Sequence, residues 1–206
     1  MATQEKPPVV QELLQANEKY KNSFTNGDLP LPPAKKVAVL ACMDARLDPA
    51  RALGLEEGDA HVIRNAGGRA KDALRSLIIS QILLGTKHVV ILHHTDCGMR
   101  TFSNADIQAK IKERDGHESD IPDFLPYPDD EWGVREDIQL IRDSPHVPKD
   151  VTVHGVQRMH ALQPAPPMSD RDTGGPSVQI ACKRVAFVVK FSKTSPWDFR
   201  NCCNGY

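Results

Sequence analysis

Short apolar runs, separated by polar segments and turn residues, limit the possible folds of this chain more than any other feature of its sequence. Four such runs, at residues 37–41, 60–64, 88–93 and 151–154, have the length and β-branched content of strands. The run at 88–93 is nearly continuous in its apolar character, which is typical of a parallel strand covered on both faces. We therefore expect a central, mostly parallel β-sheet.

Helical segments separate these runs. The second of them is apolar on most sides, so we expect it to be buried, with Asp72 as its N-terminal cap and Gly85 at its end. Alternation of strands and helices predicts an α/β fold in which right-handed crossovers place helices on both faces of the sheet. The expected helices span residues 48–54, 72–84, 103–114 and 129–142.

An amphipathic segment at residues 9–24 precedes the first strand. Its apolar side chains fall near one helical face, which indicates a helical arm. Monomeric proteins seldom expose such a stripe to water. We therefore predict a homodimer, or a larger assembly of the same chain, that covers the arm. The apolar residues are Val10, Leu13, Leu14, Tyr20 and Phe24.

The pattern changes after residue 155. Residues 156–206 are rich in proline, glycine and polar residues, and only the run at 185–191 resembles a strand. We expect residues 157–180 to be poorly ordered, because they offer little apolar surface to offset the entropy cost of ordering. The chain is therefore divided into a main domain at 1–155, which includes the arm, and an atypical C-terminal tail at 156–206.

Composition excludes several classes of protein. The 206 residues include 26 Lys and Arg against 27 Asp and Glu, a net charge of −1 without the basic excess of a nucleic-acid-binding surface. No apolar run approaches the ~20 residues that span a bilayer, so we expect no membrane segment. The first residues lack the features of a secretory signal, which favours a cytoplasmic protein. Five cysteines, an odd number, suit reduced thiols or metal ligands better than a disulfide framework.

Chemically distinctive residues follow two of the strand-like runs. Cys42 comes directly after the first run, and His94 and Cys97 follow the third. The carboxyl ends of parallel strands meet at one edge of a sheet, so these side chains can converge. Two thiolates and one imidazole are a zinc-type set, and three protein ligands leave a fourth position for chemistry. We predict one Zn²⁺ per chain at this edge.

Each motif alone also has a structural interpretation. A cysteine after a strand is often only a buried apolar residue. Asp44 and Arg46 could form a surface ion pair that contributes little to stability. His93 competes with His94 as a ligand, but alternation along a strand sends the two rings to opposite faces, and only His94 has the His-x-x-Cys spacing to Cys97.

The order and spacing of three motifs resemble the β-class carbonic anhydrase family, including a short-chain subgroup that reads Cys-Met-Asp-Ala-Arg. The motifs are Cys42-x-Asp44-x-Arg46, the run at 64–68 (Arg-Asn-Ala-Gly-Gly) and His94-Thr95-x-Cys97-Gly98. The resemblance spans residues 9–155. It implies a zinc enzyme that interconverts carbon dioxide and bicarbonate, usually as a dimer in which an N-terminal helix embraces the neighbouring subunit.

The resemblance also suggests roles for single residues. Asp44 would accept a hydrogen bond from the nucleophile at zinc and aim it at carbon dioxide, while Arg46 holds the carboxylate in a bidentate pair. Asp44 could instead swing onto zinc as a fourth ligand in a closed state. Gly98 would let a small oxyanion approach the backbone, or merely turn the chain. Asp96 either orients a ligand or caps the next turn, and we favour the structural role.

Two other functions remain open on the sequence alone. Relatives with the same ligands hydrolyse carbonyl sulfide or carbon disulfide, which are linear molecules isoelectronic in their valence shells with carbon dioxide. The atypical tail at 156–206 also raises the possibility of a zinc-binding protein without catalysis, since a strand missing from the sheet edge would weaken dimerisation and the cleft. Residues 64–68 are expected to shape the wall of that cleft without touching the reacting atoms.

Overall fold

A computed structural model describes residues 7–158 and 187–189 of the chain. The chain divides into two units, Met1–Leu31 and Pro32–Tyr206. The first unit contains a single described helix, α1 (Pro8–Ser23), which confirms the helical arm expected from the sequence. Among the described residues of α1, no side chain is buried within the chain.

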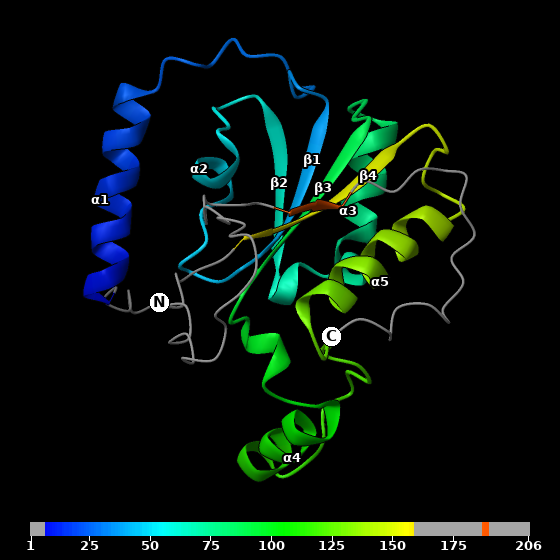
Figure 1. Ribbon diagram of the computed structural model, residues 1–206. Coiled ribbons are helices and arrows are strands. Elements are labelled where there is room, and N and C mark those ends of the chain that lie inside the picture. Colours follow the sequence, from blue (N-terminus) through cyan, green and yellow to red (C-terminus); the bar gives the residue numbers. More distant parts are fainter. Residues whose placement is uncertain (1–6, 159–186, 190–206) are drawn as a thin grey trace, which may run out of the picture. The chain divides into compact units, whose positions relative to one another are not determined.

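The second unit is built on a five-stranded sheet with the order β2-β1-β3-β4-β5 (Figure 1). Its first four strands are parallel, and β5 pairs antiparallel with β4. This arrangement confirms the mostly parallel sheet expected from the sequence. The strands are β1 (Val37–Cys42), β2 (Ala60–Asn65), β3 (His88–His94), β4 (Thr152–Arg158) and β5 (Phe187–Val189).

Four α-helices connect these strands, and two of them begin at the caps expected from the sequence. The Asp48 carboxylate accepts a hydrogen bond from the backbone N–H of Arg51 (3.2 Å), and Ser103 forms a capping box with Asp106. Gly54, in a left-handed conformation, ends the helix that Asp48 caps. The helices are α2 (Pro49–Leu53), α3 (Ala70–Ile82), α4 (Asn104–Asp115) and α5 (Asp130–Asp143).

Both faces of the sheet are covered. Ala38 and Leu40 of β1 point into a core shared with α3 and α5, which pack on the same face (Figure 1). Val39 and Ala41 point the opposite way, into a second core that also contains Cys42. The two-residue period of the strand therefore delivers apolar side chains to both sides, which explains why the strands read as continuous apolar runs.

The start of α3 differs from the expectation. Asp72 was expected to cap the helix, but α3 begins two residues earlier and its N-cap is Arg69, whose side chain makes no capping bond. The first N–H of the helix, that of Ala70, donates instead to Asp137 Oδ1 of α5 (2.8 Å). A carboxylate from another helix thus accepts the N–H that a local capping side chain usually accepts.

The end of α3 is also less buried than expected. Its apolar residues Ile79, Ile82 and Leu83 are 38%, 62% and 74% exposed. The helix buries Ala73 and Leu77 in the core and packs Leu74 and Ile78 partly against it, so only the apolar edge that carries Ile79 and Ile82 faces solvent. The prediction that this helix is buried was therefore wrong for one edge of its carboxyl-terminal half, whereas Leu77, Ser80 and Gln81 in that half are buried.

The C-terminal tail contributes to the sheet. Strand β4 continues past residue 155 to Arg158, and β5 supplies three residues of the strand expected at 185–191. Most of the segment expected to be poorly ordered, residues 159–180, lies outside the described residues. In the part of the chain that the structure describes, no helix is long and apolar enough to cross a bilayer.

Candidate metal centre

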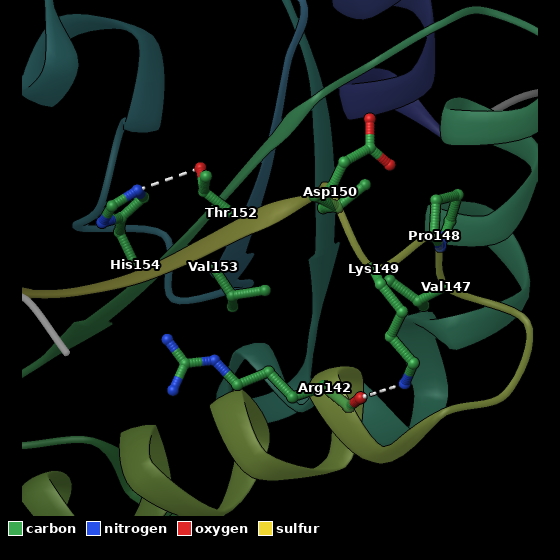
Figure 2. Close-up of a pocket in the computed structure, with 9 residues that line it drawn as sticks. Arg142, Val147, Pro148, Lys149, Asp150, Thr152, Val153 and His154 are labelled. Atoms are coloured by element: carbon green, nitrogen blue, oxygen red, sulfur yellow. Dashed lines mark hydrogen bonds between the residues drawn. The ribbon is translucent and has the colours of Figure 1, made fainter. Parts of the chain in front are cut away.

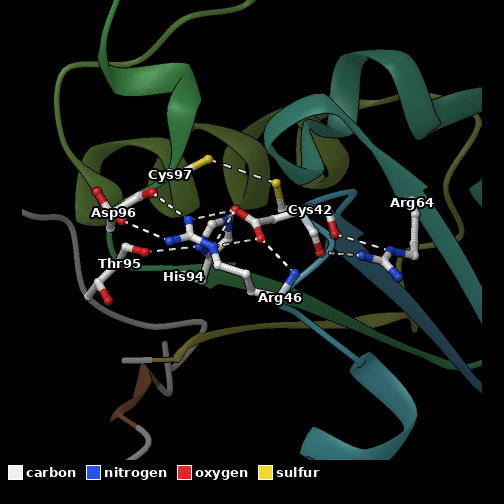
Figure 3. Close-up of polar contacts among 8 residues, drawn as sticks. Cys42, Arg46, Arg64, His94, Thr95, Asp96 and Cys97 are labelled. Atoms are coloured by element: carbon white, nitrogen blue, oxygen red, sulfur yellow. Dashed lines mark hydrogen bonds and ion pairs between the residues drawn. The ribbon is translucent and has the colours of Figure 1, made fainter. Parts of the chain in front are cut away.

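The two motifs converge because their strands are neighbours. Strands β1 and β3 pair directly and in parallel, so Cys42 at the end of β1 and His94 at the end of β3 reach the same edge of the sheet (Figure 3). Cys97 follows in the loop after β3, and its Sγ lies 3.8 Å from Cys42 Sγ. All three side chains are buried, and their potential ligand atoms lie within 4.8 Å of one another.

Neighbouring histidines point to opposite sides of β3, as alternation predicts. The ring of His94 joins the thiol cluster, with Nδ1 placed 2.9 Å from the carbonyl oxygen of Thr95. A nitrogen facing a carbonyl must carry the proton, so Nε2 offers its lone pair on the cluster side. His93 instead stacks on Tyr127 and places its Nε2 3.3 Å from Asp137 Oδ2, on the other side of the strand.

The cluster suits a zinc ion in both geometry and charge. Two sulfur atoms bound to one tetrahedral zinc at ~2.3 Å each would lie about 3.8 Å apart, which matches the separation of the two Sγ atoms. Their shared hydrogen bond raises the pKa of the Cys42 thiol and lowers the pKa of the Cys97 thiol. Burial lowers the pKa of His94, but the interactions with Cys97, the Thr95 carbonyl and Asp44 together outweigh it, and the net shift is upward. The cluster therefore attracts positive charge.

An aspartate–arginine pair stands beside the cluster. Asp44 Oδ1 and Oδ2 accept hydrogen bonds from Arg46 Nε (3.0 Å) and Nη2 (2.8 Å), in the bidentate arrangement expected from the sequence. The backbone N–H of Arg46 donates to Oδ1 as well (2.8 Å). These hydrogen bonds hold the pKa of Asp44 well below its usual range. Asp44 is thus a permanent carboxylate, and its Oδ2 lies 3.8 Å from His94 Nε2.

The run at 64–68 supports the backbone of the first motif. Arg64 of β2 donates from Nε to the carbonyl oxygen of Cys42 (3.1 Å) and from Nη2 to that of Asp44 (2.8 Å). Gly68 packs so closely that a Cβ there would lie 2.9 Å from the backbone nitrogen of Cys42. These residues fix the path of the chain from Cys42 to Asp44.

Asp96 occupies a different position from the one expected. The short turn after it, Gly98–Arg100, has no side-chain cap. Asp96 instead contacts Arg46 twice: its Oδ2 accepts from Nη1 (2.9 Å) and its carbonyl oxygen accepts from Nη2 (3.1 Å). The contact joins residues 50 positions apart, so no local spacing in the sequence could reveal it.

Gly98 borders open space. A Cβ at this position would meet no heavy atom within 4 Å, and Gly98 is absent from the glycines with a positive φ. Neither close packing nor a left-handed turn therefore requires glycine here. Room for a small molecule fits this geometry better than a need to turn the chain.

Three buried residues behind the cluster carried no signal in the sequence. Tyr127 is 3% exposed, packs in the same core as both cysteines, and has its pKa raised by burial and then by its interaction with Cys97. Asp137 is fully buried between His93 and Arg69, and Arg69 also lies 5.2 Å from the Tyr127 ring centroid. Tyr127 lies in a loop, Asp137 in α5 and Arg69 directly before α3, and only the folded chain brings them together.

A pocket of about 360 Å³ lies between the end of α5 and the start of β4, and its lining includes Arg142 and Lys149 (Figure 2). Thr152, also in the lining, pairs with His88, the first residue of β3. The pocket is therefore at the amino ends of the parallel strands, whereas His94 lies at the carboxyl end of β3. It is not part of the metal centre.

Fold and site together define an α/β protein with a buried Cys₂His metal centre at the carboxyl edge of a parallel sheet. The carbonic anhydrase family model matches residues 37–123. β-Carbonic anhydrase 1 of Mycobacterium tuberculosis is 46% identical over 150 residues, which cover 71% of this chain and 90% of that protein. The chain belongs to the β-class carbonic anhydrase family.

Two further similarities bear on structure and substrate. The crystal structure of a carbonic anhydrase from Streptococcus mutans superposes with a TM-score of 0.71 at 44% identity, and the match covers 75% of this chain and 94% of that one. A carbon disulfide hydrolase of Acidithiobacillus thiooxidans is 31% identical over 165 residues, covering 70% of this chain and 83% of that protein. The chain is thus more similar to the carbonic anhydrases than to this hydrolase.

Proposed function

We propose that this chain catalyses the reversible hydration of carbon dioxide to bicarbonate and a proton, with one Zn²⁺ held by Cys42, His94 and Cys97. The observation that carries the proposal is a carboxylate, Asp44, held by Arg46 beside a buried Cys₂His cluster. Zinc bound there supplies chemistry by acidifying water, which gives a hydroxide nucleophile near neutral pH.

Asp44 and Arg46 would perform the positioning. Because Asp44 stays ionised, it can only accept a hydrogen bond. The nucleophile would therefore point its O–H toward the carboxylate and a lone pair away from it. Arg46 fixes the carboxylate with two parallel hydrogen bonds. The guanidinium cannot lose its proton at working pH, so the orientation persists throughout the reaction.

The same carboxylate would also act as a gate. Its Oδ2 lies 3.8 Å from His94 Nε2, so the carboxylate stands beside the residues that would hold the metal and could serve as a fourth ligand in a closed state. In that closed state Asp44 would exclude water. The pairing with Arg46 corresponds to the open state, and rising pH should favour opening because hydroxide then competes for the metal.

Gly98 would contribute space for the substrate. The volume beside its Cα is open, and it lies next to Cys97 in the loop that follows β3. A linear triatomic molecule or the planar bicarbonate ion would fit where a side chain would otherwise project. We assign Gly98 a substrate-binding role on this basis.

We propose that the chain works as a homodimer, with larger assemblies as a further possibility. The first unit carries exposed apolar residues on α1, such as Leu13 (65% exposed), and the second unit has its own exposed apolar residues in Val62, Ile82 and Leu83. A second copy would cover such surfaces. A solution mass of 22.8 kDa for the active species, that of one chain, would contradict this assembly.

The organisation of the chain supports the same function. All the residues assigned to the site lie within residues 1–155, which we propose as the zinc domain with its arm. Among the described residues, the segment 156–206 adds the end of β4 and the short strand β5. Two thiols that bind zinc must stay reduced, which fits a reducing, cytoplasmic compartment.

Parallel assays test the substrate. Carbonyl sulfide and carbon disulfide hydrolysis is the alternative, because the 31%-identical relative from Acidithiobacillus thiooxidans is a carbon disulfide hydrolase. Zinc-loaded protein should hydrate carbon dioxide in a stopped-flow assay and release little sulfide from the other two substrates. Fast sulfide release with negligible hydration would reverse the assignment, and full zinc content without any turnover from about pH 7 to 9 would indicate an inactive zinc protein.

A further inference from the structure

The guanidinium of Arg46 is held on two sides. One side, formed by Nε and Nη2, donates to the Asp44 carboxylate (3.0 and 2.8 Å). The other side donates from Nη1 to Asp96 Oδ2 (2.9 Å) and from Nη2 to the Asp96 carbonyl oxygen (3.1 Å). An arginine has five N–H groups on this fork, and four of them are engaged by these two aspartates.

The backbone at Asp96 is shaped for this contact. Its φ of 59° lies in the left-handed region, which is uncommon outside glycine and favours Asn and Asp among the other residues. In this conformation the carboxylate and the carbonyl oxygen of the same residue both face Arg46 (Figure 3). The loop that carries Cys97 and the arginine that holds Asp44 are therefore tied together directly.

We propose that Asp96 is a positioning residue for the Asp44–Arg46 pair, an inference that rests on the proposed function. Arg46 is 52% exposed, and its long side chain would otherwise sample other rotamers in water. Asp96 confines the guanidinium to the one orientation in which its Nε edge faces Asp44. Without Asp96, Asp44 would lose its partner for part of the time and the gate would spend less time open.

An ordinary surface ion pair is the competing explanation. The Asp96 side chain is 79% exposed, and such a pair alone has little effect on stability. Two features distinguish Asp96 from that case: it binds Arg46 through a backbone oxygen as well as its carboxylate, and it contacts the same guanidinium that clamps Asp44. Its effect should therefore appear in the order of Arg46 and in turnover, while protein stability changes little.

The test uses zinc-loaded full-length protein with the variants Asp96→Asn and Asp96→Gly. Both replacements tolerate a left-handed backbone, so the fold is preserved while the carboxylate is neutralised or removed. Asp115→Asn is the matched control, because Asp115 forms an exposed pair with Arg114 on α4, away from the site. The readouts are zinc per chain, thermal unfolding, kcat and KM for hydration, and hydrogen exchange of the Arg46 Nε–H by NMR, assigned by its loss in Arg46→Lys.

We expect Asp96→Gly to lower kcat about 10-fold, the lower end of the range for partners that orient catalytic groups, with KM, zinc content and unfolding temperature nearly unchanged. The Arg46 Nε–H should exchange faster in both Asp96 variants, with the smaller change in Asp96→Asn, and as in wild type in Asp115→Asn. Unchanged exchange at Arg46 in Asp96→Gly would overturn the proposal. Faster exchange in a protein whose wild type hydrates no carbon dioxide would uphold the positioning contact and refute the proposed function instead.

Discussion

Oδ2 of Asp44 lies 3.8 Å from Nε2 of His94, at the boundary between the thiol cluster and the exposed Asp44–Arg46 pair. The same oxygen accepts a hydrogen bond from Arg46 Nη2 (2.8 Å). This oxygen is thus held by the guanidinium and lies beside one of the residues that would hold a metal. In the proposed mechanism, the side-chain position of Asp44 would decide whether water can reach the metal centre.

Removing one thiol should empty the metal centre. In Cys97→Ser the hydroxyl is a poorer zinc ligand and the Sγ–Sγ pair of 3.8 Å is lost, so we expect zinc content to fall from one per chain toward zero. Elemental analysis of dialysed protein measures this. Cys182→Ser, a thiol outside the described residues, is the control and should retain zinc. Full zinc occupancy in Cys97→Ser would show that the ligand set is wrong.

Loss of the Asp137 carboxylate should destabilise the fold strongly. Asp137 is fully buried, accepts the first N–H of α3 and faces both His93 and Arg69. Asp137→Ala would leave the Ala70 N–H without its acceptor and would remove the carboxylate that faces the buried Arg69 guanidinium, at a cost of about 3–5 kcal/mol in the free energy of unfolding. Urea denaturation measures the change.

The exposed residue at the other end of the same helix provides the control for Asp137. Asp143→Ala should change the free energy of unfolding by less than about 0.5 kcal/mol, as expected of a surface substitution. Equal, small effects of the two substitutions would mean that the Asp137 carboxylate does not support the start of α3.

Gly68 should be intolerant of a side chain for reasons of contact as well as conformation. A Cβ at Gly68 would lie 2.9 Å from the Cys42 nitrogen, whereas at Gly85 it would meet nothing within 4 Å, and both residues have similar positive φ (67° and 70°). Gly85→Ala therefore reports the backbone strain alone. We expect Gly68→Ala to cost about 1–3 kcal/mol more and to lower zinc affinity, because the end of β1 must shift. Equal unfolding energies and zinc affinities would contradict this.

Acid should weaken the loop that precedes α5 through Asp123. Hydrogen bonds from the Asn104 side chain, from the Leu125 N–H and from Lys71 lower the pKa of Asp123 from 3.8 to about 2. A carboxylate with a lowered pKa stabilises the folded state above its unfolded pKa, and this contribution is lost as the pH falls from about 4 through about 2.

The size of this effect is limited by exposure. The Asp123 side chain is 36% exposed, so its contribution is about 1 kcal/mol or less after solvent screening. Chemical denaturation at a series of pH values should show a shallower acid loss of stability in Asp123→Asn than in wild type, whereas Asp120→Asn, in the same loop, should follow wild type. Parallel pH profiles for all three proteins would contradict this.

Much of the fold was accessible from the sequence because its signals are local. Apolar runs of strand length, caps such as Asp48 and Ser103, and terminating glycines such as Gly54 each specify an element within a few residues. The convergence of Cys42 with Cys97 was also predictable, because both follow strands whose carboxyl ends share one edge of a parallel sheet.

The parts that the sequence could not supply depend on contacts between distant residues. The first N–H of α3, that of Ala70, donates to Asp137, which is 67 residues away. The partner of Asp96 is Arg46, which is 50 residues away. Neither pair has a characteristic spacing, since its geometry is set by how helices and loops pack after the elements have formed. For the same reason the sequence around Tyr127 does not predict that this residue packs in the same core as the two cysteines.

Turnover of Arg46→Ala at matched zinc content decides whether the Asp44–Arg46 pair positions the nucleophile for hydration of carbon dioxide. Stopped-flow hydration should give a kcat/KM at least about 100-fold below wild type, the size expected for lost positioning, while zinc stays at one per chain. Arg114→Ala, which breaks an exposed pair on α4, should match wild type. Near-normal turnover in zinc-loaded Arg46→Ala would show that the pair is only a structural ion pair and would contradict the mechanism.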